Sequence, residues 1–169
     1  MVVRDELAWV KYLMRIWREL EDFYRERIQA LDLYQAETKR LAHEQSAILD
    51  KARLKLRAGQ LPSSLEQAGI LHALQVVIEN AIGKAKHLLQ AAGEPIPVSA
   101  YDAFTSLARI SVLPSADVLQ WNDVIGIPHR IVHGYMNIDM AVILDLVRAA
   151  RHHFVAEFLL RPISLTGEA

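Results

Sequence analysis

The sequence predicts an all-α fold, an up-and-down bundle of five or six helices, and three observations lead to this prediction. Apolar residues recur at three- and four-residue spacing over most of the chain, which is the pattern of a helix with one buried face. Residues 1–58 contain neither Gly nor Pro to interrupt a helix. No segment alternates apolar and polar residues as a half-buried strand does.

A long first helix is predicted from the N-terminus to about residue 31. Its apolar face consists of Val10, Leu13, Met14, Trp17, Leu20, Tyr24, Ile28 and Leu31. From about Tyr34 the apolar phase changes, and it resumes weakly through Leu41, Ile48, Leu49 and Ala52. Either a tight turn at residues 31–33 makes a helical hairpin or one very long helix continues, and we favour the hairpin.

A capping box predicts where the next helix begins. Ser63 and Glu66 are three positions apart, directly after the helix-ending segment from Gly59 to Pro62, so their side chains can satisfy free amides of the first turn. Gly93 is expected to end this helix, because glycine readily adopts the left-handed conformation there. The apolar stripe of the helix consists of Leu71, Leu74, Ile78, Ile82, Ala85 and Leu89.

A short helix follows a rigid loop. Pro95 and Pro97 restrict the loop, and Ser99 with Asp102 predicts a helix start that continues through Ile110.

Two more helices complete the predicted bundle. One begins after Pro114 and contains Pro128, which is expected to bend or break it near residues 124–126 because proline cannot donate the backbone hydrogen bond. The last is capped by Asn137 or Asp139. Its inward face is predicted to be Met140, Ile143, Val147, Ala150, Phe154 and Phe158.

The length of 169 residues suits one domain with a substantial core. We expect a single domain over residues 1–161 and a flexible tail over residues 162–169. The apolar fraction of 52% is slightly high and leaves apolar surface for a partner, which favours a dimer.

The composition excludes several classes of chemistry. Without cysteine there is no disulfide, thiolate metal site or cysteine nucleophile. The N-terminal segment lacks the pattern of a signal peptide, and no apolar run approaches the roughly 20 residues of a membrane span, so we expect a soluble, cytoplasmic protein. The net charge of -1 gives no general attraction to nucleic acid, so any RNA contact must be local.

The main functional signal is Arg130, His133 and Tyr135, which bring a cation, a base and a phenol together near a predicted helix end. A histidine that titrates near neutrality can take or give a proton in catalysis. An arginine can stabilise negative charge that develops on oxygen atoms of a substrate. This chemistry requires neither a metal nor a cofactor.

Residues 123–139 read Asp-Val-Ile-Gly-Ile-Pro-His-Arg-Ile-Val-His-Gly-Tyr-Met-Asn-Ile-Asp. This segment resembles the signature of HepT-like HEPN proteins. The likeness extends to residues 73–82 and 103–114, and it covers about residues 65–150.

The resemblance implies a HEPN-like helical bundle that forms a homodimer. It places an Arg and a His of each subunit in a shared cleft, where they cleave RNA, a tRNA or an mRNA, without metal. It also implies a toxin whose antitoxin is a minimal nucleotidyltransferase that attaches AMP to a Tyr two residues after the His. By position, the catalytic His here is His133 and the AMPylated residue is Tyr135.

The sequence departs from the family pattern before His133. The family Arg precedes the His with four to six residues between them, and those positions hold Gly126, Ile127 and Pro128 here. Arg130 is three residues before His133, about 60° away around a helix, and can reach the same face. Two functions therefore stay open. The chain is either a ribonuclease in which Arg130 replaces the missing Arg, or a catalytically impaired module that still dimerises and binds a nucleotidyltransferase.

The sequence contains two weaker patterns. His129 and His133 have the spacing of a two-histidine metal site to which His152 and His153 could add ligands, but no Glu is followed by a His three residues later as in di-iron bundles. A four-helix metal protein therefore stays open as a third, weaker interpretation, and we assign none of these residues as a metal ligand.

Four cations lie within seven residues without an acid between them, namely Lys51, Arg53, Lys55 and Arg57. They either contact RNA phosphates, together with His129, or form a solvated face near a helix end.

Overall fold

The computed structural model describes residues 2–133 and 139–165, with side chains for residues 6–127 and 139–165. Within these residues the chain forms six α-helices, one 3-10 helix and no strand, which confirms the predicted all-α fold. The elements are α1 (Val2–Arg57), α2 (Ser64–Ala91), α3 (Ala100–Arg109), η1 (Ser115–Asp117), α4 (Val118–His133), α5 (Met140–Arg148) and α6 (His152–Leu160). None of the described helices combines the length and apolar character that a membrane span needs.

The predicted hairpin at residues 31–33 is wrong, because α1 is one helix of 56 residues. Its C-terminal half packs in the bundle through the buried residues Leu31, Ala42, Leu49 and Leu56. The change of apolar phase near Tyr34 thus marks the place where α1 enters the bundle. Both interpretations of the periodicity were compatible with the sequence. A continuous helix keeps its backbone hydrogen bonds through residues 31–33, whereas a turn would interrupt them.

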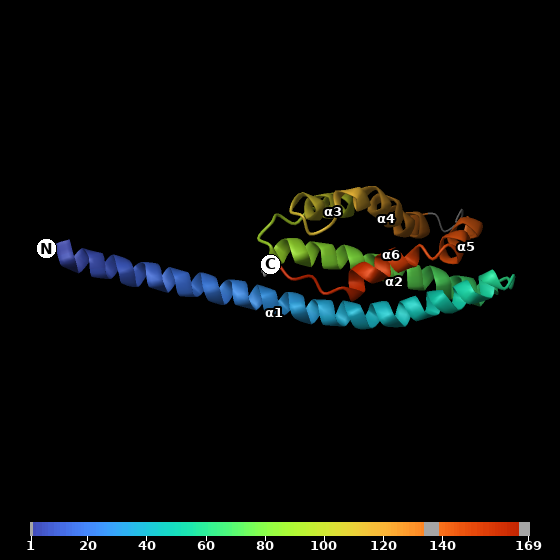
Figure 1. Ribbon diagram of the computed structural model, residues 1–169, viewed down its shortest axis with the longest axis horizontal. Helices are drawn as coiled ribbons and strands as arrows, with labels where there is room; N and C mark the ends of the chain where they lie inside the picture. The colour runs from blue at the N-terminus through green and yellow to red at the C-terminus, as the bar shows by residue number, and fades with distance from the viewer. Residues whose placement is uncertain (1, 134–138, 166–169) are drawn as a thin grey trace.

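The N-terminal half of α1 extends beyond the rest of the molecule, as Figure 1 shows. We call residues 6–28 the arm. The apolar stripe predicted for the first helix lies on the arm and is exposed rather than buried, with Trp17 exposed by 73% and Met14 by 60%. The stripe was predicted correctly as a helix face, but the bundle covers none of its large residues before Leu31.

The central helix of the bundle is α2, which contacts α1 as well as α3, α4 and α6 (Figure 1). The predicted capping box is present, because the Ser63 hydroxyl accepts a hydrogen bond from the Glu66 amide at 3.2 Å and the Glu66 carboxylate accepts one from the Ser63 amide at 2.8 Å. Gly93 has φ +73° and lies directly beyond the end of α2, as expected.

The short helix predicted after Pro97 is α3, with Ser99 as its N-cap. Phe104 of α3 stacks on Trp121 of α4 with ring centroids 4.1 Å apart, and Trp121 meets Phe158 of α6 edge-on at 5.0 Å. These three rings are almost fully buried and join three helices in one core.

The helix that contains Pro128 is continuous. α4 runs from Val118 to His133, so the helix is not broken near residues 124–126, and the alternative of a bend there stays a prediction. The missing amide of Pro128 therefore does not end the helix, because the surrounding turns keep their helical conformation.

The last predicted helix is divided into α5 and α6. Ala150 adopts φ 56°, a left-handed conformation that ends α5 after Arg148, and the Arg151 amide donates a hydrogen bond back to the Leu146 carbonyl at 3.0 Å. Asp139, which is one of the two residues predicted to cap this helix, is the N-cap of α5. The turn lets both Val147 of α5 and the face of α6 reach the core.

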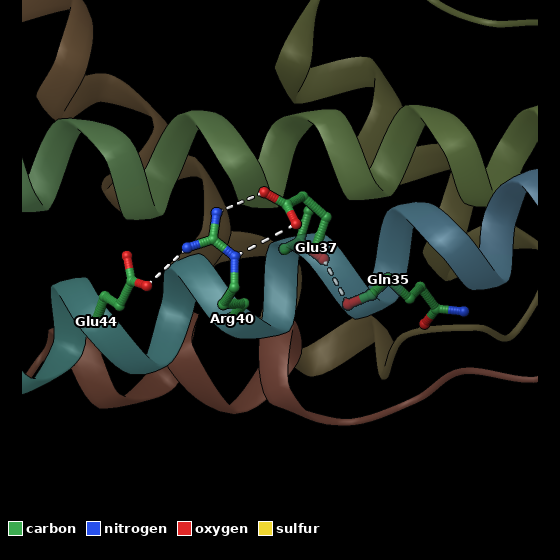
Figure 2. Close-up of polar contacts among 5 residues, drawn as sticks. Gln35, Glu37, Arg40 and Glu44 are labelled. Atoms are coloured by element: carbon green, nitrogen blue, oxygen red, sulfur yellow. Dashed lines mark hydrogen bonds and ion pairs between the residues drawn. The ribbon is translucent and has the colours of Figure 1, made fainter.

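Figure 2 shows the middle of α1, where Arg40 pairs with Glu37 at 2.6 Å and with Glu44 at 2.7 Å. The hydrogen bond from Arg40 lowers the pKa of the Glu37 carboxyl. These pairs are exposed and contribute little to stability. Nearby, the Gln35 side chain donates to the Ile163 carbonyl at 3.2 Å and accepts from the Ile163 amide at 3.0 Å, so the start of the predicted tail lies against α1.

Candidate functional site

The predicted catalytic motif lies at the C-terminal end of α4. The backbone of residues 128–133 is helical, which supports the assumption that Arg130 and His133 lie on neighbouring sides of one helix. The side chains of Pro128, His129, Arg130 and His133 lie outside the described residues, and so does the whole of Tyr135.

A cavity of about 290 Å³ lies beside α4, just before the motif. Its apolar walls come from α2, α4, α5 and α6, and Ile127 is the lining residue nearest in sequence to Arg130. Four polar residues line it, namely Gln120, Asp123, Arg151 and His152. A carboxylate, a guanidinium and an imidazole thus line one cavity at the start of the segment that carries the motif.

His152 is held at the base of α6 by a carboxylate from α1. Its Nε2 lies 2.8 Å from Asp50 Oδ1, and the Nε2 of His153 lies 2.6 Å from the same oxygen. His152 is buried, whereas Asp50 and His153 are half-buried. Burial lowers the pKa of the His152 imidazole, and the hydrogen bond to Asp50 opposes this only in part. Burial alone would raise the pKa of the Asp50 carboxyl, but the hydrogen bonds from the two histidines hold it below its ordinary value.

Lys84 of α2 is completely buried and caps the end of α6. Its ammonium donates hydrogen bonds to the carbonyl oxygens of Phe158 at 2.6 Å and Arg161 at 2.7 Å, with a longer one to Leu159. These carbonyls belong to the last turn of α6, where no further helical amide is available to them. Burial first, and the nearby charge of Arg161 second, lower the pKa of Lys84 to about 8.

The four cations at the end of α1 form two pairs that face different sides of the helix. Lys55 pairs with Glu66 at the start of α2, whereas Arg53 donates a hydrogen bond to the Arg148 carbonyl at the end of α5 at 3.3 Å. Two positions along a helix correspond to about 200° around its axis, so Lys51 and Lys55 face differently from Arg53 and Arg57. Two of the four are thus engaged in contacts between helices, and a single RNA patch over all four stays a prediction.

Two of these features were not predicted from the sequence, namely the contact of Asp50 with His152 and the buried Lys84. No local signal connects Asp50 to His152, because 102 positions separate them. Lys84 did have a signal, since it falls on the same buried face of α2 as Val77, Ala81 and Leu88, at helical spacing.

Comparison with protein families matches residues 18–159 to a family described as Ribonuclease HepT-like. The matched range includes α1 from Arg18 onward, α2 to α5, the motif at the end of α4, and α6 as far as Leu159. No match was found among curated proteins.

Proposed function

Because this chain belongs to the HepT-like ribonuclease family, we propose that it is an endoribonuclease whose chemistry requires no metal and in which His133 acts as the acid–base catalyst. The observation that supports this most strongly is the family match itself, which spans residues 18–159 and contains the Arg-Ile-Val-His-Gly-Tyr motif.

The reaction uses the nucleophile of the substrate. The 2′-oxygen of RNA loses its proton and attacks the adjacent phosphorus, the bond to the 5′-oxygen breaks, and that oxygen receives a proton as it leaves. A 2′,3′-cyclic phosphate and a 5′-hydroxyl result. The imidazole of His133 transfers protons in this scheme, and Arg130 stabilises the negative charge that develops on the phosphoryl oxygens.

The same proposal includes a toxin–antitoxin pair. The antitoxin is a minimal nucleotidyltransferase that transfers AMP to the hydroxyl of Tyr135. The added phosphate is anionic and bulky, so next to His133 it repels and blocks the RNA backbone. Tyr135 is two residues from His133, which supports a direct block of the active site.

The proposal also includes self-association of the chain, which the exposed arm supports. Large apolar patches on a protein surface usually mark an interface. The arm exposes five aromatic side chains by 45% or more, namely Trp9, Tyr12, Trp17, Phe23 and Tyr24. Buried aromatic residues each cover about 150–250 Å², and a specific interface needs about 800 Å² per partner, so the arm is of adequate size.

The charges of the arm favour a second copy in antiparallel orientation. Residues 11–18 contain three cations and no acid, and residues 19–22 contain three acids and no cation. An antiparallel pair of arms places these segments of opposite sign side by side, whereas a parallel pair places each beside its own copy.

The test of the proposed chemistry is cleavage of tRNA and mRNA by purified protein in the presence of EDTA. We expect cleavage by the unaltered chain, and a loss of 100-fold or more, roughly, when the acid–base group is removed by His133→Ala. His43→Ala, which changes an exposed histidine of α1, is the matched control. Equal cleavage by the His133→Ala variant would remove His133 from the mechanism.

A second candidate function rests on Pro128. This residue occupies a position where the family has its Arg, and α4 continues through it as a helix. The chain would then be a non-catalytic module that retains the bundle, the dimer and the nucleotidyltransferase partner.

A further inference from the structure

Three side chains with metal-binding chemistry converge at the junction of α1 and α6. Asp50 comes from α1, and His152 and His153 are the first two residues of α6. One donor atom from each of the three lies within 4.8 Å of the other two. Among the described residues, this is the one group of three or more such side chains.

The two histidines are adjacent in sequence, and adjacent residues of a helix normally point about 100° apart. Here both imidazoles nevertheless direct Nε2 at the same oxygen of Asp50, at 2.8 and 2.6 Å. Their rings meet edge-on with centroids 4.5 Å apart. The donors are therefore already gathered by hydrogen bonds to one carboxylate.

The burial of the three side chains suits a site that is fixed on one side and open on the other. The His152 side chain is exposed by only 1%, whereas those of Asp50 and His153 are exposed by 49% and 44%. An ion can enter from the exposed side and keep a water molecule there as its fourth ligand.

We propose that Asp50, His152 and His153 bind one transition-metal ion per chain, with zinc as the best match. Two imidazole nitrogens and one carboxylate oxygen are a common ligand set for zinc, whereas magnesium and calcium prefer sites made of oxygen atoms alone. Ligands of tetrahedral zinc are about 3.3 Å apart, so the nitrogen–oxygen separations would open by roughly half an ångström.

The bound ion would connect two segments that are 102 positions apart in the chain. Because it fastens the start of α6 to α1, it stabilises the folded state through binding. None of the three ligands belongs to the motif from Arg130 to Tyr135, so the proposed ion takes no part in the proposed RNA chemistry.

The experiment starts from full-length protein that has been treated with EDTA and then freed of the chelator. Calorimetric titration with zinc chloride should show one ion per chain, and the Tm should rise with the zinc concentration. Asp50→Asn and His153→Ala each remove a ligand, so each should weaken zinc binding by about tenfold or more. Both variants should remain folded without zinc, as judged by circular dichroism.

Two controls separate this site from other histidines. His43→Ala should bind zinc as the unaltered chain does, because His43 is an exposed residue elsewhere on α1. The double variant His129→Ala/His133→Ala should also retain binding, since it removes the alternative pair on α4. In the unaltered chain, zinc should shift the imidazole NMR signals of His152 and His153, which tests the site without any variant.

Two results would overturn the proposal. One is the absence of saturable binding near one zinc per chain in the unaltered protein. The other is unchanged binding in Asp50→Asn and His153→Ala together with loss in the α4 double variant, which would place the ion at the motif instead.

Discussion

The side chain of Tyr34 on α1 occupies the space that a β-carbon on Gly83 of α2 would need. The Tyr34 ring also stacks on His87 of α2, with centroids 3.7 Å apart. The two longest helices are therefore in contact where α2 has no side chain, and the phenol of Tyr34 fills that place.

The first prediction concerns this contact. Gly83→Ala should lower the free energy of unfolding by about 1–3 kcal/mol, because the new methyl group overlaps the Tyr34 side chain. The matched control is Gly69→Ala on the same helix, where nothing lies within 4 Å of the added carbon. That change should raise the free energy of unfolding by about 0.5–1 kcal/mol, because alanine favours a helix. Urea unfolding measures both, and equal effects would contradict the close approach.

The second prediction is that Lys84→Met lowers the free energy of unfolding by about 1–3 kcal/mol, because it leaves buried carbonyls at the end of α6 without a donor. Lys86→Met is the matched control, since Lys86 makes its hydrogen bond to Val98 at the surface. It should have an effect within about 0.5 kcal/mol. The prediction fails when the two variants unfold at the same urea concentration.

The third prediction is a pH dependence due to Lys84. Its pKa is about 8 in the folded chain, whereas an unfolded lysine titrates at about 10.4. Between these values the unfolded chain binds more protons than the folded one, so the contribution of Lys84 to stability rises with pH. The stability difference between the unaltered chain and Lys84→Met should therefore increase from pH 8 to pH 10. A decrease over that range would show that the carbonyl contacts keep the lysine charged.

The fourth prediction concerns the arm. Leu13→Glu/Leu20→Glu places two charges on its exposed apolar stripe and should convert the proposed homodimer into a monomer, as measured by light scattering after gel filtration. The control variant Leu61→Glu/Leu65→Glu changes two leucines that are exposed by 86% and 84% outside the arm, and it should remain dimeric. A dimer that survives the arm variant would place the interface elsewhere.

The fifth prediction distinguishes the two candidate functions. If Pro128 has abolished catalysis, Pro128→Arg should create ribonuclease activity and toxicity where the unaltered chain has neither. If Arg130 already serves as the phosphate clamp, the unaltered chain should cleave RNA and Arg130→Ala should reduce cleavage by about 100-fold or more. Expression toxicity and RNA cleavage by the purified variants provide the measurement.

Several elements were predictable because their signals are local. Ser63 and Glu66 fix the start of α2, and Ser99 fixes that of α3, since a cap depends on residues three positions apart. The division between α5 and α6 was not predictable in this way. It depends on Ala150 in a left-handed conformation, which a sequence rarely signals without glycine.

The same distinction between local and long-range signals applies to the candidate functional residues. The motif from Arg130 to Tyr135 is contiguous, so the sequence alone could identify it, and the family match includes it. The cluster of Asp50 with His152 and His153 could not be predicted, because it requires the packing of α6 on α1.

By itself, the sequence determined the helical periodicity, the helix caps and the motif from Arg130 to Tyr135, because each depends on neighbours within a few turns. Only the tertiary structure decided that α1 is one continuous helix with an exposed arm and which buried polar groups meet. Those outcomes depend on how helices that are distant in sequence pack into one core. Apolar periodicity identifies the face of a helix that can be buried, but it does not identify the element that covers this face.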